Sequence, residues 1–398
     1  MILGVFFTNS SLFFELKQVR ARYISIFIRQ REKASHMKKK LVDSIRNQSG
    51  LFVIAGPCSA ESRAQVDHIT QALSLNPTVK LLRAGIWKPR THPDSFEGLG
   101  EKALPWLVES GKKYGIPTCT EVANKSHVEA ALTAGVDALW IGARTTVNPF
   151  AVQEIADALK GTDTSILIKN PINPDLELWL GAFERFNNAG LNDLTAIHRG
   201  FSIYNHAKYR NVPSWEIPIA FNEKRPDVPM ICDPSHISGK RELLLEVSQY
   251  AMDLNFDGLM IETHPDPDIA WSDAKQQVDA NGLLDLIKKL VLRQPDFSQD
   301  VATMIDEIRD KVSLLDDRLF EILSDRMQLS EEVGVLKREN NITVLQQEHW
   351  NKLISKRLTQ SDDYHLTNQF VRTLMDAIHQ ESIRHQTRIM NPKTTKHT

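Results

Sequence analysis

The sequence has few cysteines, no surplus of charge and no long hydrophobic run. Three cysteines, Cys58, Cys119 and Cys232, in 398 residues make no disulfide framework, so we expect a protein of the reducing cytoplasm. A formal net charge of −2 argues against nucleic acid as a partner. No apolar run is long enough to suggest a membrane as a partner either. Small molecules are the partners that remain.

The length and composition predict two soluble, globular domains. The 398 residues exceed one ordinary domain, and 41% are hydrophobic, which is enough to form a sizeable core. Residues 1–36 carry no convincing signal peptide, so we interpret them as an extension that is disordered or precedes the true start at Met37. We therefore predict a first domain over 37–292, a polar linker over 293–302, a second domain over 303–390 and a tail over 391–398.

Short apolar runs alternate with segments of helical composition throughout the first domain. Eight such units over about 240 residues favour a closed (β/α)8 TIM barrel, an α/β fold, although the count alone leaves an open, doubly wound sheet possible. The expected strands are Leu51–Ala55, Val79–Arg83, Pro117–Glu121, Ala138–Ile141, Ser165–Lys169, Leu194–His198, Val228–Cys232 and Gly258–Glu262.

Charged or polar residues follow nearly every expected strand. The densest group comes after the second strand, where Arg83, Lys88, Arg90 and Thr91 place three cations and a hydroxyl within nine residues, as a phosphate site requires. Chemistry in such barrels lies at the carboxyl ends of the strands, so these side chains should converge on one anionic substrate. The other strand-end residues in this group are Cys58, Glu121, Arg144, Lys169, Asn170, His198, Arg199, Asp233, His236, Glu262 and His264.

Three of these positions, Cys58, His236 and Glu262, and a following acid, Asp273, carry the side chains that bind a divalent transition metal. Thiolate, imidazole and carboxylate together suit manganese, iron, cobalt or zinc without choosing among them. His264 is a second candidate, although a neighbouring histidine can equally orient a ligand. Cys119 and Cys232 lie within strands and are expected to be structural. The expected metal ligands are Cys58, His236, Glu262 and Asp273.

The first domain resembles the metal-dependent 3-deoxy-arabino-heptulosonate 7-phosphate (DAHP) synthases over roughly residues 45–292. The resemblance rests on Ala55–Ser59, Lys88–Thr91, Ile141–Arg144, Ile168–Asn170, His198–Gly200, Cys232–His236, Met260–His264 and Ser272–Asp273. It implies that phosphoenolpyruvate is bound by Arg83, Lys88, Glu121, Arg144, Lys169 and Arg199. It also implies that Arg90 and Thr91 bind erythrose 4-phosphate, and that the four metal ligands are those named above. Lys88 is our candidate proton donor to the developing alkoxide, with a water at the metal as the alternative.

A related family, the 3-deoxy-octulosonate 8-phosphate synthases, condenses phosphoenolpyruvate with a five-carbon sugar phosphate. Its loop typically has Ala-Asn where this sequence has Pro89 and Arg90. The resemblance therefore favours the four-carbon aldose.

The second domain shows helical periodicity. Apolar residues recur every three or four positions at Ile305, Ile308, Val312, Leu315, Leu319, Ile322, Leu329, Val333 and Leu336. Over about 32 residues such a helix is roughly 48 Å long, so we expect it to pair with other helices, including those of a second copy in a homodimer. Arg326 interrupts the apolar face, either as a snorkelling or salt-bridged residue or as a ligand for an anion.

This domain resembles the all-helical chorismate mutases through Ile308–Asp316 and Glu332–Lys337. The resemblance implies an all-α fold and rearrangement of chorismate to prephenate. It implies substrate contacts from Arg326, Lys337, Ser382 and Gln386, with Arg309 reaching the partner's site and Lys337 and Gln386 at the ether oxygen. Cations that grip two carboxylates and donors to that oxygen are sufficient for this reaction.

One segment departs from the mutase pattern. Where many members carry Asp and an Arg-Glu pair, this sequence has Gln346, His349 and Trp350. Recognition of the chorismate hydroxyl then falls to other groups, for which Gln346 and Glu348 are candidates.

The main hypothesis is a bifunctional enzyme whose second domain also mediates feedback regulation. The alternatives are a one-activity synthase with a domain that senses prephenate or chorismate, or one with a dimerisation hairpin.

Overall fold

The computed structural model describes residues 40–48, 50–89, 94–204, 208–293 and 298–391. Predictions for residues 1–36, for Arg90 and Thr91 and for most of the tail concern positions outside these ranges. The chain forms two compact units, Met1–Pro295 and Asp296–Thr398, which are described separately. Among the described residues, no helix combines the length and apolarity needed to cross a membrane.

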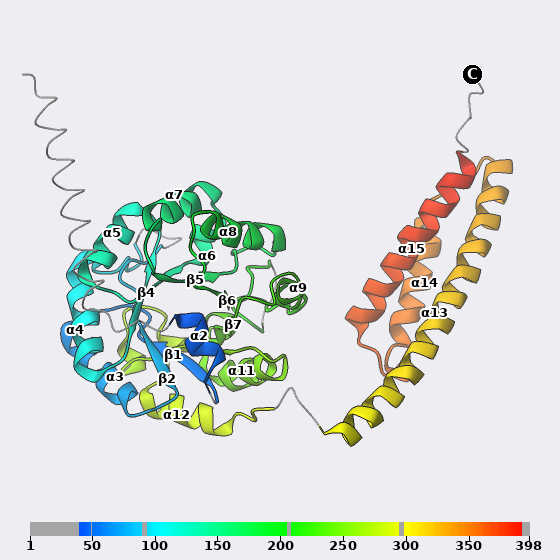
Figure 1. Ribbon diagram of the computed structural model, residues 1–398. Coiled ribbons are helices and arrows are strands. Elements are labelled where there is room, and N and C mark those ends of the chain that lie inside the picture. Colours follow the sequence, from blue (N-terminus) through cyan, green and yellow to red (C-terminus); the bar gives the residue numbers. More distant parts are fainter. Residues whose placement is uncertain (1–39, 49, 90–93, 205–207, 294–297, 392–398) are drawn as a thin grey trace, which may run out of the picture. The chain divides into compact units, whose positions relative to one another are not determined.

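The first unit is a closed barrel of parallel strands that pair in sequence order, which confirms the predicted (β/α)8 architecture (Figure 1). Three strands, β1, β3 and β7, differ by one or two residues from the predicted runs. The strands are β1 Phe52–Gly56, β2 Val79–Arg83, β3 Thr118–Val122, β4 Ala138–Ile141, β5 Ser165–Lys169, β6 Leu194–His198, β7 Met230–Cys232 and β8 Gly258–Glu262.

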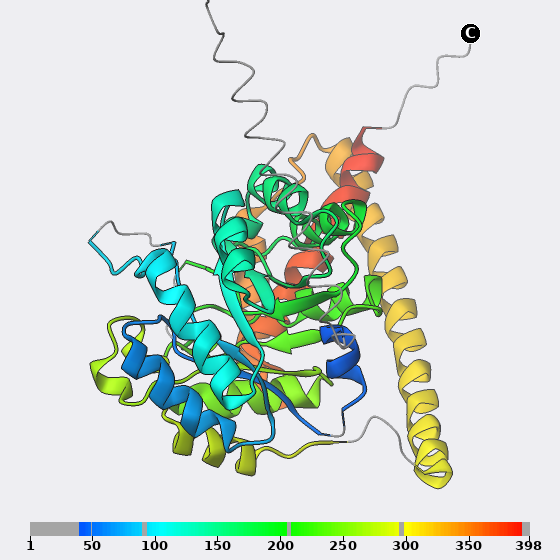
Figure 2. The same cartoon turned by 60° about the vertical axis from the view of Figure 1, so that its left-hand side comes forward.

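Helices surround the strands on the outside of the barrel (Figure 2). The α-helices are α2 Leu41–Arg46, α3 Arg63–Ser74, α4 Leu104–Tyr114, α5 Lys125–Ala134, α6 Ala143–Thr146, α7 Pro149–Leu159, α8 Leu176–Asn188, α9 Glu216–Lys224, α10 Pro234–Ser238, α11 Leu244–Asp253 and α12 Ala280–Lys289. Short 3-10 turns add η1 Gly100–Ala103, η2 Arg241–Leu243, η3 Pro267–Ile269 and η4 Ala274–Gln276.

The alternation of side chains along each strand divides the core into two clusters. In β1, Phe52 and Ile54 belong to the cluster inside the barrel, whereas Val53 and Ala55 belong to the cluster between strands and helices. Helix α2 closes the amino-terminal end of the barrel, where Ile45 joins the inner cluster. Its first turn is held by Asp193, whose carboxylate accepts hydrogen bonds from two α2 backbone N–H groups, each 2.9 Å long.

The same alternation brings charge to the opposite end of the barrel. Leu81, Leu167, Ile231 and Met260 are inner residues of their strands. Two positions further along, the side chain faces the same interior at the carboxyl end. The residues at those positions are Arg83, Lys169, Asp233 and Glu262. A layer of buried charge therefore lies directly above the apolar interior.

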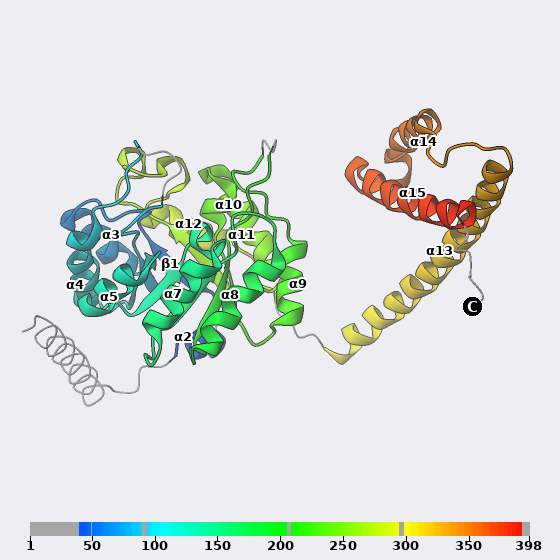
Figure 3. The same cartoon turned by 90° about the horizontal axis from the view of Figure 1, so that it is seen from above.

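The second unit consists of α13 Gln299–Glu339, α14 Gln347–Thr359, the 3-10 turn η5 Asp362–Tyr364 and α15 Asn368–Met390. Helix α13 has 41 residues and begins inside the segment 293–302 that was predicted as linker, so it is longer than expected. Helix α15 packs along the carboxyl-terminal part of α13 (Figure 3). Towards the amino-terminal end the apolar face of α13 is exposed: Leu315 is 62% and Ile322 is 64% accessible.

Gly56 ends β1 with φ +144°, and a Cβ built there would lie 2.0 Å from the carbonyl oxygen of Arg83. We predict that Gly56→Ala lowers the free energy of unfolding by about 3 kcal/mol or more, because the clash adds to the backbone strain. Gly161→Ala is the control: Gly161 also has positive φ, at +80°, but no atom lies within 4 Å of its built Cβ. It should cost about 1 kcal/mol. Equal losses in denaturant titrations would contradict the clash.

Candidate active sites of the barrel and the helical unit

Arg83 is the most deeply buried cation at the carboxyl end of the barrel, with 1% of its surface exposed. Its Nη2 donates a hydrogen bond of 2.9 Å to Oε1 of Glu262, and its guanidinium lies 5.0 Å from the Trp140 ring. The Nε and Nη1 groups have no hydrogen-bond partner in the described part of the chain. Buried donors without partners are costly, so this guanidinium is prepared to bind an anion.

Lys169 forms the second buried ion pair, with 2.7 Å between its Nζ and Oδ2 of Asp233. Oδ1 of the same carboxylate lies 3.0 Å from Nδ1 of His236. Burial raises the pKa of Asp233, but the charges of His236 and Lys169 outweigh it and hold that pKa well below its usual range. Asp233 therefore stays ionised and links the cation to the histidine.

Arg199 follows β6 and is held by two asparagines. The amide oxygen of Asn170 accepts from the Arg199 backbone N–H at 2.7 Å, and Oδ1 of Asn211 accepts from Nη1 at 2.7 Å. Burial, together with the nearby charges of Arg210 and Arg144, lowers the pKa of Arg199 to about 10. Arg199 still carries its charge at neutral pH. Arg144 is exposed, and its charge adds to the positive field around Arg199.

Glu121, another predicted phosphoenolpyruvate residue, accepts a hydrogen bond of 3.1 Å from Nε1 of Trp140. Glu121 and Lys88 also line a cavity of about 390 Å³ together with Trp87, Pro89, Glu97, Ala123 and His127. The structure thus brings together the predicted residues Arg83, Lys88, Glu121, Arg144, Lys169 and Arg199 at one end of the barrel.

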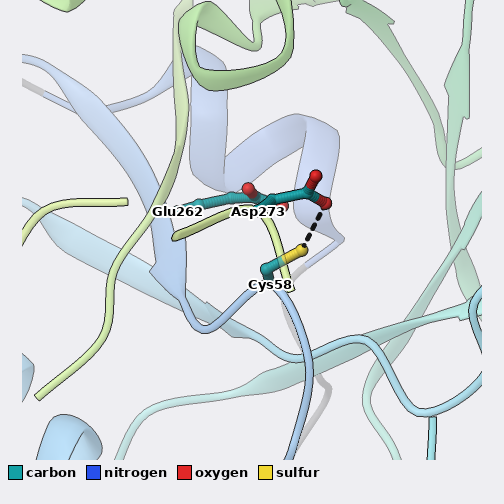
Figure 4. Close-up of side chains that lie close together, drawn as sticks. All are labelled: Cys58, Glu262 and Asp273. Atoms are coloured by element: carbon teal, nitrogen blue, oxygen red, sulfur yellow. Dashed lines mark hydrogen bonds between the residues drawn. The ribbon is translucent and has the colours of Figure 1, made fainter. Parts of the chain in front are cut away.

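The predicted metal ligands meet beside these cations. Figure 4 shows Cys58, Glu262 and Asp273, whose donor atoms all lie within 4.8 Å of one another. The fourth predicted ligand, His236, lies outside this group of mutually close donor atoms, although its Nε2 is 3.7 Å from Oε1 of Glu262. A thiol, an imidazole and two carboxylates are a donor set that fits a divalent transition metal.

The charges around Cys58 agree with a role as a ligand. Burial and the Glu262 carboxylate raise the pKa of the Cys58 thiol to about 12 in spite of the nearby Lys88 and Arg83 charges, so the thiol is protonated at neutral pH, and Sγ donates to Oδ2 of Asp273 at 3.0 Å. A bound dication displaces such a proton. Nζ of Lys88 lies 2.7 Å from Sγ and 2.8 Å from the carbonyl oxygen of Cys58. Lys88 therefore contacts the cluster of predicted ligands and also lines the cavity of about 390 Å³.

Three residues that hold this cluster together were not assigned from the sequence. Asp233 orients His236, Nε2 of Gln276 donates to Glu262 at 2.6 Å, and Nη1 of Arg210 donates to Asp273 at 2.8 Å. Asp233 was named from the sequence only as a strand-end residue, and its alternation with the inner Ile231 would also have indicated that it faces the site. Arg210 lies in a loop and Gln276 ends the three-residue 3-10 turn η4, so neither position left a periodic signal in the sequence.

Two histidines counted among the strand-end residues lie away from the metal ligands. Nδ1 of His264 lies 2.6 Å from the carbonyl oxygen of Asp266 and its Nε2 lies 3.3 Å from Glu61, so this side chain fixes the loop after β8. His198 alternates with Ile197 and faces the helices, where Trp215 and Phe256 contact its ring. Burial lowers the pKa of His198 to about 3, which keeps it neutral.

In the helical unit, two cations of α13 meet two polar residues of α15. Nη1 of Arg326 donates to Oγ of Ser382 at 2.6 Å, and Nζ of Lys337 donates to Oε1 of Gln386 at 2.9 Å. Lys337 is 8% exposed, and burial lowers its pKa and that of Arg326. The four predicted residues therefore form one cationic site.

The remaining helical candidates lie elsewhere. Arg309 is exposed, pairs with Asp306 at 3.0 Å and lies about 26 Å along α13 from Arg326, so it does not enter the site of its own chain. Glu348 pairs with Lys352 at 2.7 Å on the surface, and Gln346 is an exposed residue just before α14.

Comparison with known proteins identifies both units. A model of the DAHP synthetase I family matches residues 37–292. The chain belongs to this family. A model of type II chorismate mutase matches residues 308–387. The DAHP synthetase I chain thus carries a transferase and an isomerase of aromatic biosynthesis, as predicted.

The matched proteins agree with this assignment. A phospho-2-dehydro-3-deoxyheptonate aldolase of Thermotoga maritima is 32% identical over 259 residues, which cover 64% of this chain and 73% of the relative. A crystal structure of the Thermotoga maritima DAHP synthase matches with 30% identity and a TM-score of 0.54, covering 60% of this chain and 67% of that one. A 2-dehydro-3-deoxyphosphooctonate aldolase of Bradyrhizobium is 28% identical, covering 62% of this chain and 88% of the relative.

The contact between Asp233 and His236 generates a testable prediction. Asp233→Asn should weaken metal binding about 10-fold to 100-fold, because the carboxylate that fixes the orientation of the imidazole is lost. Titration of metal-free protein with Mn²⁺ measures the effect. Asp227→Asn is the control, since Asp227 pairs with Arg225 on the surface. Equal affinities in Asp233→Asn and wild type would show that Asp233 does not support a metal ligand.

Proposed function

We propose that this DAHP synthase condenses phosphoenolpyruvate with erythrose 4-phosphate through the residues gathered at the carboxyl end of its barrel. The observation that carries the proposal is the guanidinium of Arg83, buried with two N–H groups that have no partner among the described residues. The cations Lys169 and Arg199 are also buried at this end of the barrel. An anion with both a phosphate and a carboxylate satisfies such a set.

In the proposed reaction the protein's cations bind and orient phosphoenolpyruvate. Arg83, Lys169 and Arg199 neutralise its charges, and Arg144 and Glu121 complete the pocket. C3 attacks the aldehyde carbon of erythrose 4-phosphate, water adds at C2, and phosphate leaves. Cys58, His236, Glu262 and Asp273 would hold a divalent metal, which would supply polarisation of the aldehyde.

Lys88 is the proposed proton donor. Its ammonium contacts Cys58. Burial lowers the pKa of Lys88, but the charges around Cys58 and Glu262 raise that pKa by more. Lys88 therefore remains protonated at neutral pH, within reach of the oxygen on which negative charge develops.

Manganese, iron, cobalt and zinc all fit the donor set of the proposed metal site.

Arg90 and Thr91 are proposed to bind the phosphate of the aldose. The alternative substrate, arabinose 5-phosphate, has support from the octulosonate aldolases among the relatives. The Thermotoga maritima aldolase has the higher identity, and Pro89 and Arg90 depart from the octulosonate loop, so we favour erythrose 4-phosphate.

For the helical unit, we propose that Arg326, Lys337, Ser382 and Gln386 bind chorismate and rearrange it to prephenate. Arg326 grips a carboxylate, while Lys337 and Gln386 stabilise the ether oxygen as its bond breaks. Both cations are paired with neutral oxygens, so their charge is available to a dianion.

The exposed apolar face of α13 supports a homodimer through this unit. Val312, Leu315 and Leu319 lie on the face that would become buried, and Arg309 would reach the partner's site. We further propose that the enzyme acts in the cytoplasm and that prephenate bound to this unit regulates the condensation reaction of the barrel. Adding prephenate to the condensation assay tests this regulation directly.

The choice of aldose is tested by turnover. With phosphoenolpyruvate in excess, we expect kcat/KM for erythrose 4-phosphate to exceed that for arabinose 5-phosphate by at least about 100-fold, because the pocket must exclude an added carbon and hydroxyl. Phosphate release measures both. Faster turnover of arabinose 5-phosphate would assign the barrel to the octulosonate reaction.

The shared mutase site is tested by mixing variants. Arg326→Ala and Arg309→Ala should each lose most chorismate turnover while keeping condensation activity. When the two variants are co-refolded or co-expressed, activity should return. In a dimer with one copy of each variant, one of the two sites contains both Arg326 and Arg309. Chorismate absorbance follows the reaction. No turnover in the wild type would refute the mutase assignment, and no regain on mixing would refute the shared site.

A further inference from the structure

The segment of α14 that departs from the mutase pattern lies against a histidine of α15. The rings of Trp350 and His379 stack with centroids 4.0 Å apart and planes 8° apart. Trp350 lies four residues before the buried Ile354, so the stack forms on the side of α14 that packs inward. Both rings are half-buried, and each restricts the orientation of the other.

His379 lies on the same face of α15 as the substrate residues. It precedes Ser382 by three residues and Gln386 by seven, spacings that place all three side chains along one stripe of an α-helix. Ser382 and Gln386 contact Arg326 and Lys337 of α13. The His379 ring therefore extends the row of polar side chains that faces the two cations.

The electrostatic surroundings keep this imidazole neutral. Burial lowers the pKa of His379, and the positive charges of Arg326 and Lys337 lower it further, outweighing Asp376. A neutral imidazole offers one nitrogen as an acceptor and one as a donor. It is thus an acceptor in a site whose other side chains include two cations.

Such an acceptor is needed in this site. The hydroxyl of chorismate must give up its hydrogen bonds to water on binding, and a buried hydroxyl without a partner is costly. Trp350 occupies the position where the family pattern has a carboxylate. Of the two candidate acceptors from the sequence, Glu348 is paired with Lys352 on the surface, and Gln346 is exposed just before α14.

We propose that His379 is a substrate-binding residue of the mutase site, where its ring accepts a hydrogen bond from the hydroxyl of chorismate, and that Trp350 positions it by stacking. The inference rests on the proposed mutase function of the helical unit. The acceptor that recognises the hydroxyl is supplied by α15, and an aromatic side chain of α14 supports it.

The test compares chorismate with an analogue that lacks the ring hydroxyl, using the full-length protein. His379→Leu should lower kcat/KM for chorismate about 10-fold to 100-fold, as expected for loss of a buried hydrogen bond. The same change should alter kcat/KM for the analogue by less than about 3-fold, since that substrate has no hydroxyl to bind. Unchanged condensation activity serves as the folding control.

The role of Trp350 is tested with a conservative variant. Trp350→Ala should weaken the discrimination between chorismate and the analogue, and Trp350→Phe, which keeps an aromatic face, should restore it. His385→Leu is the matched control on α15, because His385 pairs with Glu331 at 2.7 Å and contacts none of the substrate residues in the described hydrogen bonds.

The outcomes separate the two claims. Turnover by the wild type combined with equal losses for both substrates in His379→Leu would overturn the hydroxyl contact and leave the mutase function in place. Unchanged chorismate turnover in His379→Leu would do the same. No turnover by the wild type would overturn the mutase function and this inference together.

Discussion

Charge buried at the carboxyl end of a closed barrel must be balanced there, and the rest of the barrel site depends on this constraint. Arg83 pairs with Glu262, and Lys169 pairs with Asp233, which also contacts His236. An unpaired charge in such a position would be strongly destabilising. Because Glu262 and His236 are also expected metal ligands, the substrate cations and the metal ligands form one electrostatic network.

The helical unit meets a similar constraint in a different way. Its cations, Arg326 and Lys337, contact the neutral oxygens of Ser382 and Gln386. Within 298–391, the described part of this unit, neither cation forms an ion pair with a carboxylate, so their positive charge is available to a dianion. The barrel thus holds its cations by ion pairs, whereas the helical unit holds its cations by hydrogen bonds to neutral groups. The remaining apolar face of the helical unit is exposed.

Local sequence periodicity accounts for what could be predicted. Alternation along β2 and β8 places Arg83 and Glu262 in the same layer, so a list of strand ends already approximates the site. The same rule, applied more strictly, predicts that His198 and Arg199 point to different sides of the barrel wall, because neighbouring strand residues face opposite sides. Contacts that depend on loop conformation, such as those of Arg210 with Asp273, leave no such pattern.

The helical site shows the same limit. Spacing on α13 indicated Arg326 as a cation in an apolar face, but the stack of Trp350 on His379 joins two helices through a loop whose path no periodicity encodes. The length of α13 was underestimated because the polar residues before Thr303 read as a linker, whereas helix propensity and the first turn extend the helix to Gln299.

The central claim is that the metal ligands and the substrate cations of the barrel form one network, and linked binding tests it most directly. Titration of phosphoenolpyruvate with and without Mn²⁺ measures the coupling. A metal ion that neutralises Glu262 frees Arg83 for the substrate, so Mn²⁺ should tighten phosphoenolpyruvate binding at least about 10-fold. Equal affinities with and without Mn²⁺ would contradict the shared network.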